Sequence, residues 1–293
     1  MLLSKLLPEI SGIGEYHIIR ESPFDVLARI TTETESKACV FLEEKKYAKQ
    51  IMENVSMVIT SECLEKQVVE EVGKNVGFCI CEKPKTLYFQ VLNFISGEEI
   101  SEETVIGKNC KISPQAYIAP RGVKIEDDVC IEEFASIYEG TTIGEGSVIH
   151  AGAKIGIQDF NFYRDAEQVC HVNHRGRTLL GKGVEVGFNT VIGRGLYSYG
   201  TTSVGNYTKI ACNTSIGHDV SIGKNVMINS NVAIGGHVAI GDDASIALSI
   251  GIKNTLSIGE SAKVQMGSSV IRSVPAKAVV FGNPAKPLLS PRL

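Results

Sequence analysis

An aliphatic residue occupies every sixth position across the second half of the chain. The series is Val204, Ile210, Ile216, Ile222, Ile228, Ile234, Ile240, Ile246, Ile252, Ile258, Val264 and Val270. A period of six fits neither the 3.6 residues of a helical turn nor the alternation of a single strand, and it is typical of a parallel β-helix. Each six-residue unit is expected to form one short strand and one corner, with the branched side chain pointing inward.

Glycine often follows the inward residue, as in Ile216-Gly217, Ile222-Gly223 and Ile240-Gly241. Because glycine tolerates positive φ, these glycines are expected to form the tight corners. If three units form one triangular coil, residues eighteen apart lie one above the other, about 4.8 Å away, which is one strand spacing. This rule converts sequence separation into predicted contacts.

The six-residue spacing begins near Ile106 and predicts a β-helix over residues 105–273. It slips by one residue at 120–122, breaks at 158–178, returns over 180–192 and breaks again at 194–203. Three inward positions per coil give about eight coils, and prolines after residue 274 end the pattern, because proline cannot donate to a strand ladder. Residues 274–293 are therefore expected to form a C-terminal tail. The two breaks are candidate functional loops on a rigid scaffold.

The first 97 residues show a different pattern, in which predicted strands alternate with predicted helices. Strands are expected at 38–42, 56–59 and 76–81, and helices at 24–30, 45–52, 64–72 and 84–95. This alternation is typical of a small α/β domain with a mostly parallel sheet. The polar segment 98–104 is expected to link it to the β-helix.

Composition excludes several classes of protein. The 293 residues carry a net charge of −4, and no basic stretch indicates a nucleic-acid partner. Apolar runs stay well below the roughly eighteen residues that span a membrane, and the start of the chain lacks the form of a signal peptide. The eight cysteines are scattered, which suits free thiols in a reducing compartment. We expect a soluble, cytosolic protein with no nucleic-acid partner, no integral membrane segment and no metal, since Cys79-Ile80-Cys81 lacks a second pair.

Several segments together resemble one family. They are residues 41–47 and 84–89 in the first domain, and 184–192 and 216–223 in the β-helix. In these segments the chain is similar to the hexapeptide-repeat acyltransferases, and most closely to the UDP-3-O-acylglucosamine N-acyltransferases of lipid A synthesis. The resemblance implies a left-handed parallel β-helix, a homotrimer, and a uridine-binding N-terminal domain.

The resemblance also implies an activity. The family moves an acyl group from a thioester on acyl carrier protein to the amine of a UDP-linked glucosamine derivative, with no bound cofactor. The ending Gly282-Asn283-Pro284-Ala285-Lys286 instead looks like relatives that use acetyl-CoA, so N-acetylation of a UDP-amino sugar is the alternative. A non-enzymatic β-helix scaffold is a third reading, because a fold does not define a function.

The sequence departs from the family pattern at three places. Family members usually carry asparagine at the position of Glu44, in the loop that meets the uracil, and often a second histidine at the position of Thr255. The helical extension common at the C-terminus of the family is missing. These departures bear on the donor and on the sugar.

His218 is the candidate catalytic residue. An amine that attacks a thioester must lose a proton, and an imidazole with a pKa of about 6.5 can accept it at neutral pH. Asp219 either orients the ring or only fills a corner. Gly236 follows His218 by eighteen residues, so its N–H is expected above the ring, where it could hold an oxyanion; otherwise it is one more corner glycine.

The first break in the pattern offers candidates for contact with the acceptor sugar. They are Asp159, Phe160, Asn161, Phe162 and Tyr163. The nearby run Cys170-His171-Val172-Asn173-His174 could bind a metal, but without a further ligand at suitable spacing a covering loop is preferred. His150 and His237 lie at positions in the repeat where they are expected to be solvated.

Phe41 and Tyr47 are the candidate uracil contacts. Phe41 ends a predicted strand, and α/β domains bind ligands at the carboxyl ends of parallel strands. Two aromatic rings there could sandwich a flat base, and the alternative for Phe41 is core packing. The family resemblance favours uracil.

Overall fold

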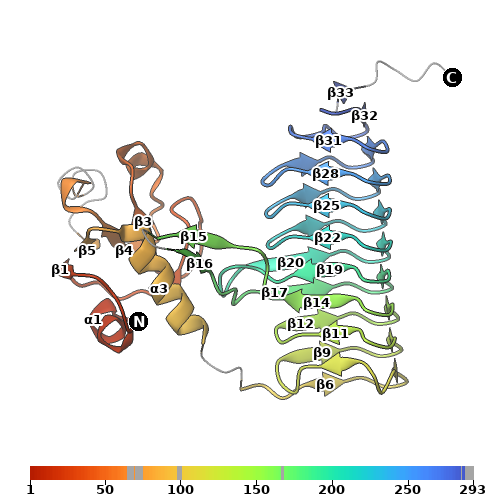
Figure 1. Cartoon of the computed structure of the whole chain (residues 1–293), viewed down its shortest axis with the longest axis horizontal. Helices are drawn as coiled ribbons and strands as arrows, with labels where there is room; N and C mark the ends of the chain where they lie inside the picture. Colours follow the sequence, from red (N-terminus) through yellow and green to blue (C-terminus); the bar gives the residue numbers. More distant parts are fainter. Residues whose placement is uncertain (65–68, 70–74, 98–100, 166–167, 285, 288–293) are drawn as a thin grey trace. The chain divides into compact units, whose positions relative to one another are not determined.

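The structure is a computed structural model that describes residues 1–64, 69, 75–97, 101–165, 168–284 and 286–287. The chain divides into two compact units (Figure 1). Unit 1 comprises Met1–Glu99 and Asn161–Asn173, and unit 2 comprises Ile100–Phe160 and His174–Leu293. The helix predicted over 64–72 and part of the predicted linker lie outside the described residues.

Unit 1 is built on a five-stranded sheet of order β1-β5-β4-β3-β2. Its strands are β1 (Tyr16–Arg20), β2 (Val26–Leu27), β3 (Ala38–Leu42), β4 (Val55–Thr60) and β5 (Gly77–Cys81). The pairs are parallel except for β1 against β5. The predicted small α/β domain with a mostly parallel sheet is confirmed.

Among the described residues of unit 1, α3 (Pro84–Ser96) is a long helix. The others are α1 (Leu3–Leu6) and the short 3₁₀ helices η1 (Leu7–Glu9) and η2 (Lys45–Gln50). Proline at the first position of α3 has no N–H to satisfy, and the buried face of the helix packs on β3 and β4. The helix predicted over 45–52 is a 3₁₀ helix, which ends at Gln50.

The prediction of a helix over residues 24–30 is wrong. The N–H groups of Asp25 and Val26 donate to Lys37 O, and Ala28 N–H donates to Cys39 O. These residues therefore form β2 at the edge of the sheet, because pairing with the neighbouring chain replaces the hydrogen bonds that a helix would make.

The first break of the six-residue pattern contributes a hairpin to unit 1, made of β15 (Phe162–Arg164) and β16 (Val169–His171). Tyr163 stacks on Phe89 of α3 with ring centres 5.3 Å apart. The side chain of Asn93 donates to His171 O at 2.8 Å and accepts from Asn173 N at 2.8 Å. These contacts fix the hairpin on α3.

Unit 2 is a parallel β-helix with three faces. The first face contains β6 (Val105–Ile106), β9 (Val123–Ile125), β12 (Thr141–Ile143), β17 (Arg177–Leu180), β20 (Thr201–Val204), β23 (Ser221–Ile222), β26 (Ala239–Ile240) and β29 (Ser257–Ile258). The second contains β8 (Tyr117–Ile118), β11 (Ser136–Ile137), β14 (Lys154–Ile157), β19 (Val191–Gly193), β22 (Ser215–Ile216), β25 (Ala233–Ile234), β28 (Gly251–Ile252) and β31 (Ser269–Val270). Eight strands on each of these faces agree with the eight coils predicted.

The third face carries the end of the described chain. It contains β7 (Lys111–Ile112), β10 (Cys130–Ile131), β13 (Val148–Ile149), β18 (Glu185–Val186), β21 (Lys209–Ile210), β24 (Met227–Ile228), β27 (Ser245–Ile246), β30 (Lys263–Val264), β32 (Val279–Phe281) and β33 (Lys286–Pro287). All of its pairs are parallel except β32 with β33. The strand ladder thus continues into the segment predicted to be a tail.

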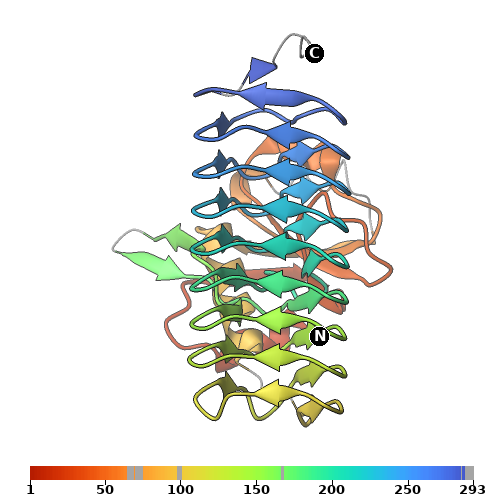
Figure 2. The same ribbon diagram turned by 90° about the vertical axis from the view of Figure 1, so that its right-hand side faces the viewer.

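The register follows the predicted separation of eighteen residues. Ile228 lies between Ile210 on one side and Ile246 on the other, and all three side chains are buried. The strands nearest the viewer in Figure 2 point to the left while the chain climbs toward its C-terminus, which is a left-handed coil. The left-handed parallel β-helix is confirmed, although most parallel crossovers are right-handed.

The expectation that glycines after the inward residue form the corners is wrong. Positive φ occurs two residues later, for example at Asp219 (56°) and Asn225 (55°). Gly223 is required for a different reason, because a Cβ there would lie 2.7 Å from the backbone nitrogen of Asp242 in the next coil. Close approach of successive coils, rather than backbone conformation, selects glycine here.

Within the described residues, no helix is both long enough and apolar enough to cross a membrane.

The stacked aliphatic interior makes a direct prediction. Ile228→Asp places an unpaired carboxylate where the side chain is 2% exposed, so we expect the variant to lose several kcal/mol of unfolding free energy. The control is Met227→Asp, one residue earlier on the same strand but 57% exposed. Urea unfolding followed by circular dichroism checks this, and equal losses in both variants would contradict the inward column.

Candidate active site

The structure brings His218 and Gly236 together in successive coils. His218 follows β22 and Gly236 follows β25, and these strands are paired in register. A Cβ on Gly236 would lie 2.7 Å from Nε2 of His218, so only a glycine lets the ring occupy this place. Among the described residues, no acceptor is found for the N–H of Gly236. This N–H is available to a ligand beside the imidazole.

His218 and Asp219 form a hydrogen-bonded pair, with Nδ1 of the ring 2.9 Å from Oδ2 of the carboxylate. Burial acts to raise the pKa of Asp219, but hydrogen bonds from His218 and from Leu196 N–H, with the nearby charge of His237, outweigh burial and lower that pKa below its ordinary value. An ionised carboxylate accepts a hydrogen bond from the protonated Nδ1, which leaves Nε2 as the ring nitrogen with a free lone pair. Nε2 is the atom that lies against Gly236.

Both breaks in the six-residue pattern hold this pair in place. In the first break, Asp159 Oδ2 accepts the backbone N–H of His218 at 2.7 Å. In the second break, Leu196 N–H donates to Asp219 Oδ2 at 3.0 Å. A Cβ on Gly200 would lie 2.3 Å from Asp219 Oδ1, so this glycine leaves room for the carboxylate. The loops therefore position the pair from two sides.

Asp159, a predicted sugar contact, has both carboxylate oxygens engaged with backbone groups, since Oδ1 accepts Phe160 N–H at 2.7 Å. The neighbouring Phe160 is 88% exposed. In unit 1, Phe162 meets His171 edge-on at 5.1 Å, and Tyr163 is buried. The sequence gives no signal for the bond from His218 to Asp159, because 59 residues separate the two.

Two further histidines lie beside His218. The ring centre of His174 is 5.3 Å from that of His218, and the ring of His237 meets His218 edge-on at 4.9 Å. Nε2 of His237 is also 3.9 Å from Asp219 Oδ2. The side chain of His237 is 29% exposed, so the expected solvation is partial, and the ring also contacts His218. The stacking rule could have found it, because His237 follows Asp219 by eighteen residues.

The run from Cys170 to His174 is divided between the units. Cys170 and His171 belong to the hairpin of unit 1, whereas His174 returns to unit 2. There the backbone of His174 is held by Gln158, whose side chain accepts His174 N–H at 2.6 Å and donates to His174 O at 3.2 Å. The side chains near that of His174 are those of Asp159 and His218, which are distant from it in sequence.

Two groups of side chains near His218 have the composition of a metal site. One is Asp159, His174 and His218, and the other is His218, Asp219 and His237. In each group, one ligand atom per residue lies within 4.8 Å of the others.

Phe41 and Tyr47 line one pocket of unit 1, with a volume of about 370 Å³. Glu44, Arg29 and Lys85 are among its other lining residues. The Tyr47 ring is partly exposed, with Lys46 Nζ 4.7 Å from its centre, while Phe41 also packs 4.9 Å from Tyr88. The predicted pair is therefore brought to a single cavity, in which Phe41 has a packing role as well.

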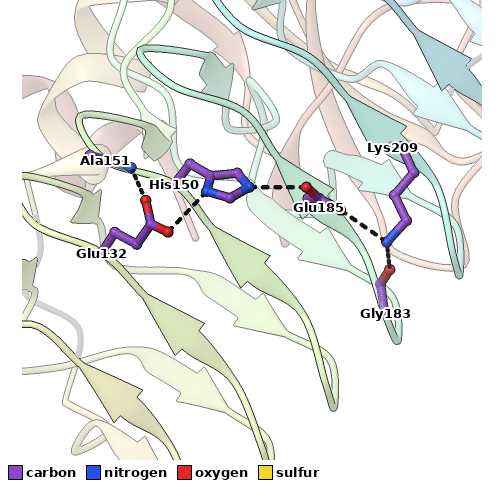
Figure 3. A network of polar contacts seen from close by, with 6 residues as sticks. All are labelled: Glu132, His150, Ala151, Gly183, Glu185 and Lys209. Carbon is purple, nitrogen blue, oxygen red and sulfur yellow. Dashed lines mark hydrogen bonds and ion pairs between the residues drawn. The ribbon is translucent and has the colours of Figure 1, made fainter.

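A second cluster of charged residues surrounds His150 on the β-helix (Figure 3). The ring nitrogens lie 3.0 Å from Glu132 Oε1 and 3.0 Å from Glu185 Oε1, on opposite sides of the ring. Glu185 is also 3.3 Å from Lys209 Nζ. The expectation that His150 is solvated is wrong, since its side chain is 20% exposed and both nitrogens have partners.

Comparisons with known proteins place these features in context. The model of the bacterial transferase hexapeptide family, with six repeats, matches residues 122–156 and 201–236. The second match contains His218, Asp219 and Gly236. The resemblance to hexapeptide-repeat acyltransferases is thereby confirmed.

Individual relatives are acyltransferases of UDP-sugars. The UDP-3-O-acylglucosamine N-acyltransferase of Caulobacter sp. (strain K31) is 32% identical over 139 residues, which is 47% of this chain and 40% of that protein. The chain therefore matches less than half the length of this curated relative. The UDP-N-acetylglucosamine acyltransferase of Bacteroides fragilis 9343 has a TM-score of 0.57 at 26% identity, covering 64% of this chain and 71% of that chain. The UDP-N-acetylglucosamine acyltransferase from Campylobacter jejuni also has a TM-score of 0.57, at 24% identity, covering 64% of this chain and 71% of that chain. This similarity shows a shared fold.

The His150 cluster makes stability depend on pH. Burial acts to lower the pKa of His150, but the two carboxylates outweigh burial and raise it, and the hydrogen bond from His150 lowers the pKa of Glu185. The contribution of His150 is complete below the unfolded imidazole pKa of about 6.5 and is lost as pH rises through the folded pKa. That of Glu185 is present above about pH 4.3 and is lost as pH falls through its folded pKa.

We therefore expect this cluster to stabilise most between about pH 4.5 and 6.5. The unfolding free energy lost in His150→Gln should be larger at pH 6 than at pH 9, as measured by urea denaturation. His17→Gln, which removes an exposed histidine from β1, controls for surface effects. A loss in His150→Gln that is equal at both pH values would show that the ring is not charged in the folded protein.

Proposed function

We propose that this protein is an N-acyltransferase that moves an acyl group from the thioester of acyl carrier protein to the amine of a UDP-linked glucosamine derivative. One observation carries the proposal: Nε2 of His218, oriented by Asp219 through Nδ1, lies against Gly236, whose N–H has no acceptor among the described residues. A base and an oxyanion donor side by side are what acyl transfer requires. The named relatives support the UDP-sugar and the acyl group.

In the proposed reaction, the amine nitrogen attacks the thioester carbonyl and Nε2 of His218 takes its proton. A C–N bond forms, and the carbonyl oxygen becomes an oxyanion that accepts the N–H of Gly236. The C–S bond then breaks, and the departing thiolate receives the proton from the imidazolium. Atoms and charge balance without a cofactor or metal.

Asp219 and the two loops hold the base ready for this reaction. The ionised carboxylate stabilises the imidazolium that forms when His218 takes the proton, as in other base–carboxylate pairs. Asp159 fixes the backbone of His218 and Leu196 fixes the carboxylate of Asp219. A scaffold without a reaction has no need of such positioning, which argues against the non-enzymatic reading.

We infer that the pocket of unit 1 binds the uridine diphosphate part of the acceptor. Its volume of about 370 Å³ lies in the range of small-molecule sites. Tyr47 offers a partly exposed ring for the base, and Arg29 and Lys85 offer positive charge for phosphate. Glu44 also lines this pocket, so the departure from the family asparagine falls where it can alter recognition of the base.

The family resemblance further implies a homotrimer, which we retain as part of the proposal. A mass by light scattering of about three times the 31.6 kDa chain is expected. A monomer at micromolar concentration would contradict it.

The uridine site is tested by Tyr47→Ala. We expect UDP binding to weaken by about 1 kcal/mol or more, because a stacking partner of the base is lost. Isothermal titration calorimetry with UDP measures the change. Tyr207→Ala, which removes a 60% exposed tyrosine from the β-helix, is the control and should bind UDP normally. Unchanged affinity in Tyr47→Ala would exclude stacking on this ring.

The mechanism is tested by His218→Ala. We expect kcat to fall by about 10²–10⁴-fold, the usual contribution of a general base, with little change in melting temperature or UDP affinity. The measurement is mass spectrometry of products from UDP-glucosamine derivatives offered with acyl carrier protein thioesters or with acyl-CoA. His150→Gln is the histidine control and should retain turnover.

The same assay separates the donors. Product formed only with acetyl-CoA would favour the alternative that the C-terminal ending suggests, which is N-acetylation of a UDP-amino sugar. Near-native turnover by His218→Ala with its true substrates would remove His218 from the mechanism. No acyl transfer to any UDP-amino sugar from either donor would overturn the proposed function.

A further inference from the structure

Three side chains, one of which is the proposed base His218, have donor atoms that converge. One ligand atom from each of Asp159, His174 and His218 lies within 4.8 Å of the others. In an equilateral arrangement at that limit, the centre is about 2.8 Å from each donor, so shifts of about 0.7 Å give the roughly 2.1 Å bonds of zinc. Two imidazoles and one carboxylate, with a position left open, form a donor set that zinc accepts in proteins.

The surroundings of His218 also match those of a metal ligand. Its Nδ1 is engaged with Asp219 at 2.9 Å, so Nε2 is the nitrogen left to bind an ion. Histidines that bind metals usually present the other ring nitrogen to a carboxylate in this way, which fixes the tautomer and orients the ring. Gln158 holds the backbone of His174 through two hydrogen bonds, so the second imidazole is also positioned.

His150 shows that histidine and carboxylates alone do not create such a site. It has two carboxylates at 3.0 Å, but they lie on opposite sides of the ring and their oxygens do not converge on one point (Figure 3). Convergence distinguishes the cluster at His218 from the cluster at His150.

We propose that a divalent transition-metal ion of the zinc class binds to His174, His218 and Asp159, with Asp219 orienting His218. A bound ion occupies the lone pair of Nε2, so the imidazole no longer accepts a proton. Zinc therefore acts as a reversible inhibitor of acyl transfer; this consequence, unlike the binding itself, rests on the proposed function. Magnesium and calcium ions are not expected to bind at this site, because they prefer oxygen donors over imidazole nitrogen.

Binding is tested on the full-length protein after treatment with a chelator. Cobalt(II) is the probe, because its visible absorption reports coordination by the protein, and zinc is then added to displace it. We expect one cobalt per chain, displaced by zinc and unaffected by magnesium. This readout requires no enzymatic activity, so its result is independent of whether acyl transfer occurs.

Matched variants locate the ion. Since loss of an outer partner of a metal ligand typically weakens affinity about 10–100-fold, loss of a ligand should weaken it at least as much. We expect this for His174→Gln and His218→Ala, and about 10–100-fold for Asp219→Asn, in which asparagine still tolerates the positive φ at this corner. His150→Gln is the control and should bind cobalt like the wild type. Circular dichroism melting accompanies each variant, and His218→Ala keeps the test valid if His174→Gln does not fold.

Absence of cobalt absorption in the wild type would overturn the proposal, as would unchanged affinity in folded His218→Ala or an equal loss in His150→Gln. Inhibition is measured separately by titrating zinc into the acyl-transfer assay and reversing it with chelator. Binding without inhibition would overturn the inhibitory role.

Discussion

The stacking of aliphatic side chains at intervals of eighteen residues is the constraint on which the rest of the β-helix depends. Each two-residue strand has too few hydrogen bonds to be stable alone, so its position is set by the strands above and below. A slip of one residue would turn the inward column outward and expose it to water. Because burial enforces the register, residues outside the column also stack at the same interval, and this places Gly236 on His218.

The parts of the structure that follow from the period could be predicted, and those that depend on the loops could not. The stacking rule of eighteen residues correctly places Gly236 above His218. Applied to Asp219, the same rule also places His237 above it. The bonds from Asp159 and Leu196 cross the two breaks, where the period is lost, so sequence spacing carries no information about them. The prediction that glycines form the corners is wrong because glycine is selected either by a positive φ or by close approach of another backbone. The sequence alone does not say which of the two applies.

The N-terminal unit shows the same limit in another form. Strands β3, β4 and β5 and helix α3 were predicted, because continuous apolar runs and a proline start are strong local signals. Residues 24–30 have an equally good local signal for a helix, yet they pair with the edge of β3. Local propensity is overridden where a sheet edge offers a longer-range partner. Phe41 and Tyr47, by contrast, were expected at one site, because the first ends a parallel strand and the second follows six residues later.

The position of the His218 coil within the stack has a consequence for its dynamics. In an array where each coil contacts only its neighbours, local unfolding begins at the ends and propagates inward. On the face that carries β22, four strands lie on the N-terminal side of it and three on the other. Fraying of the terminal coils therefore leaves the His218 coil intact, and its backbone amides should exchange with solvent deuterium more slowly than those of either end.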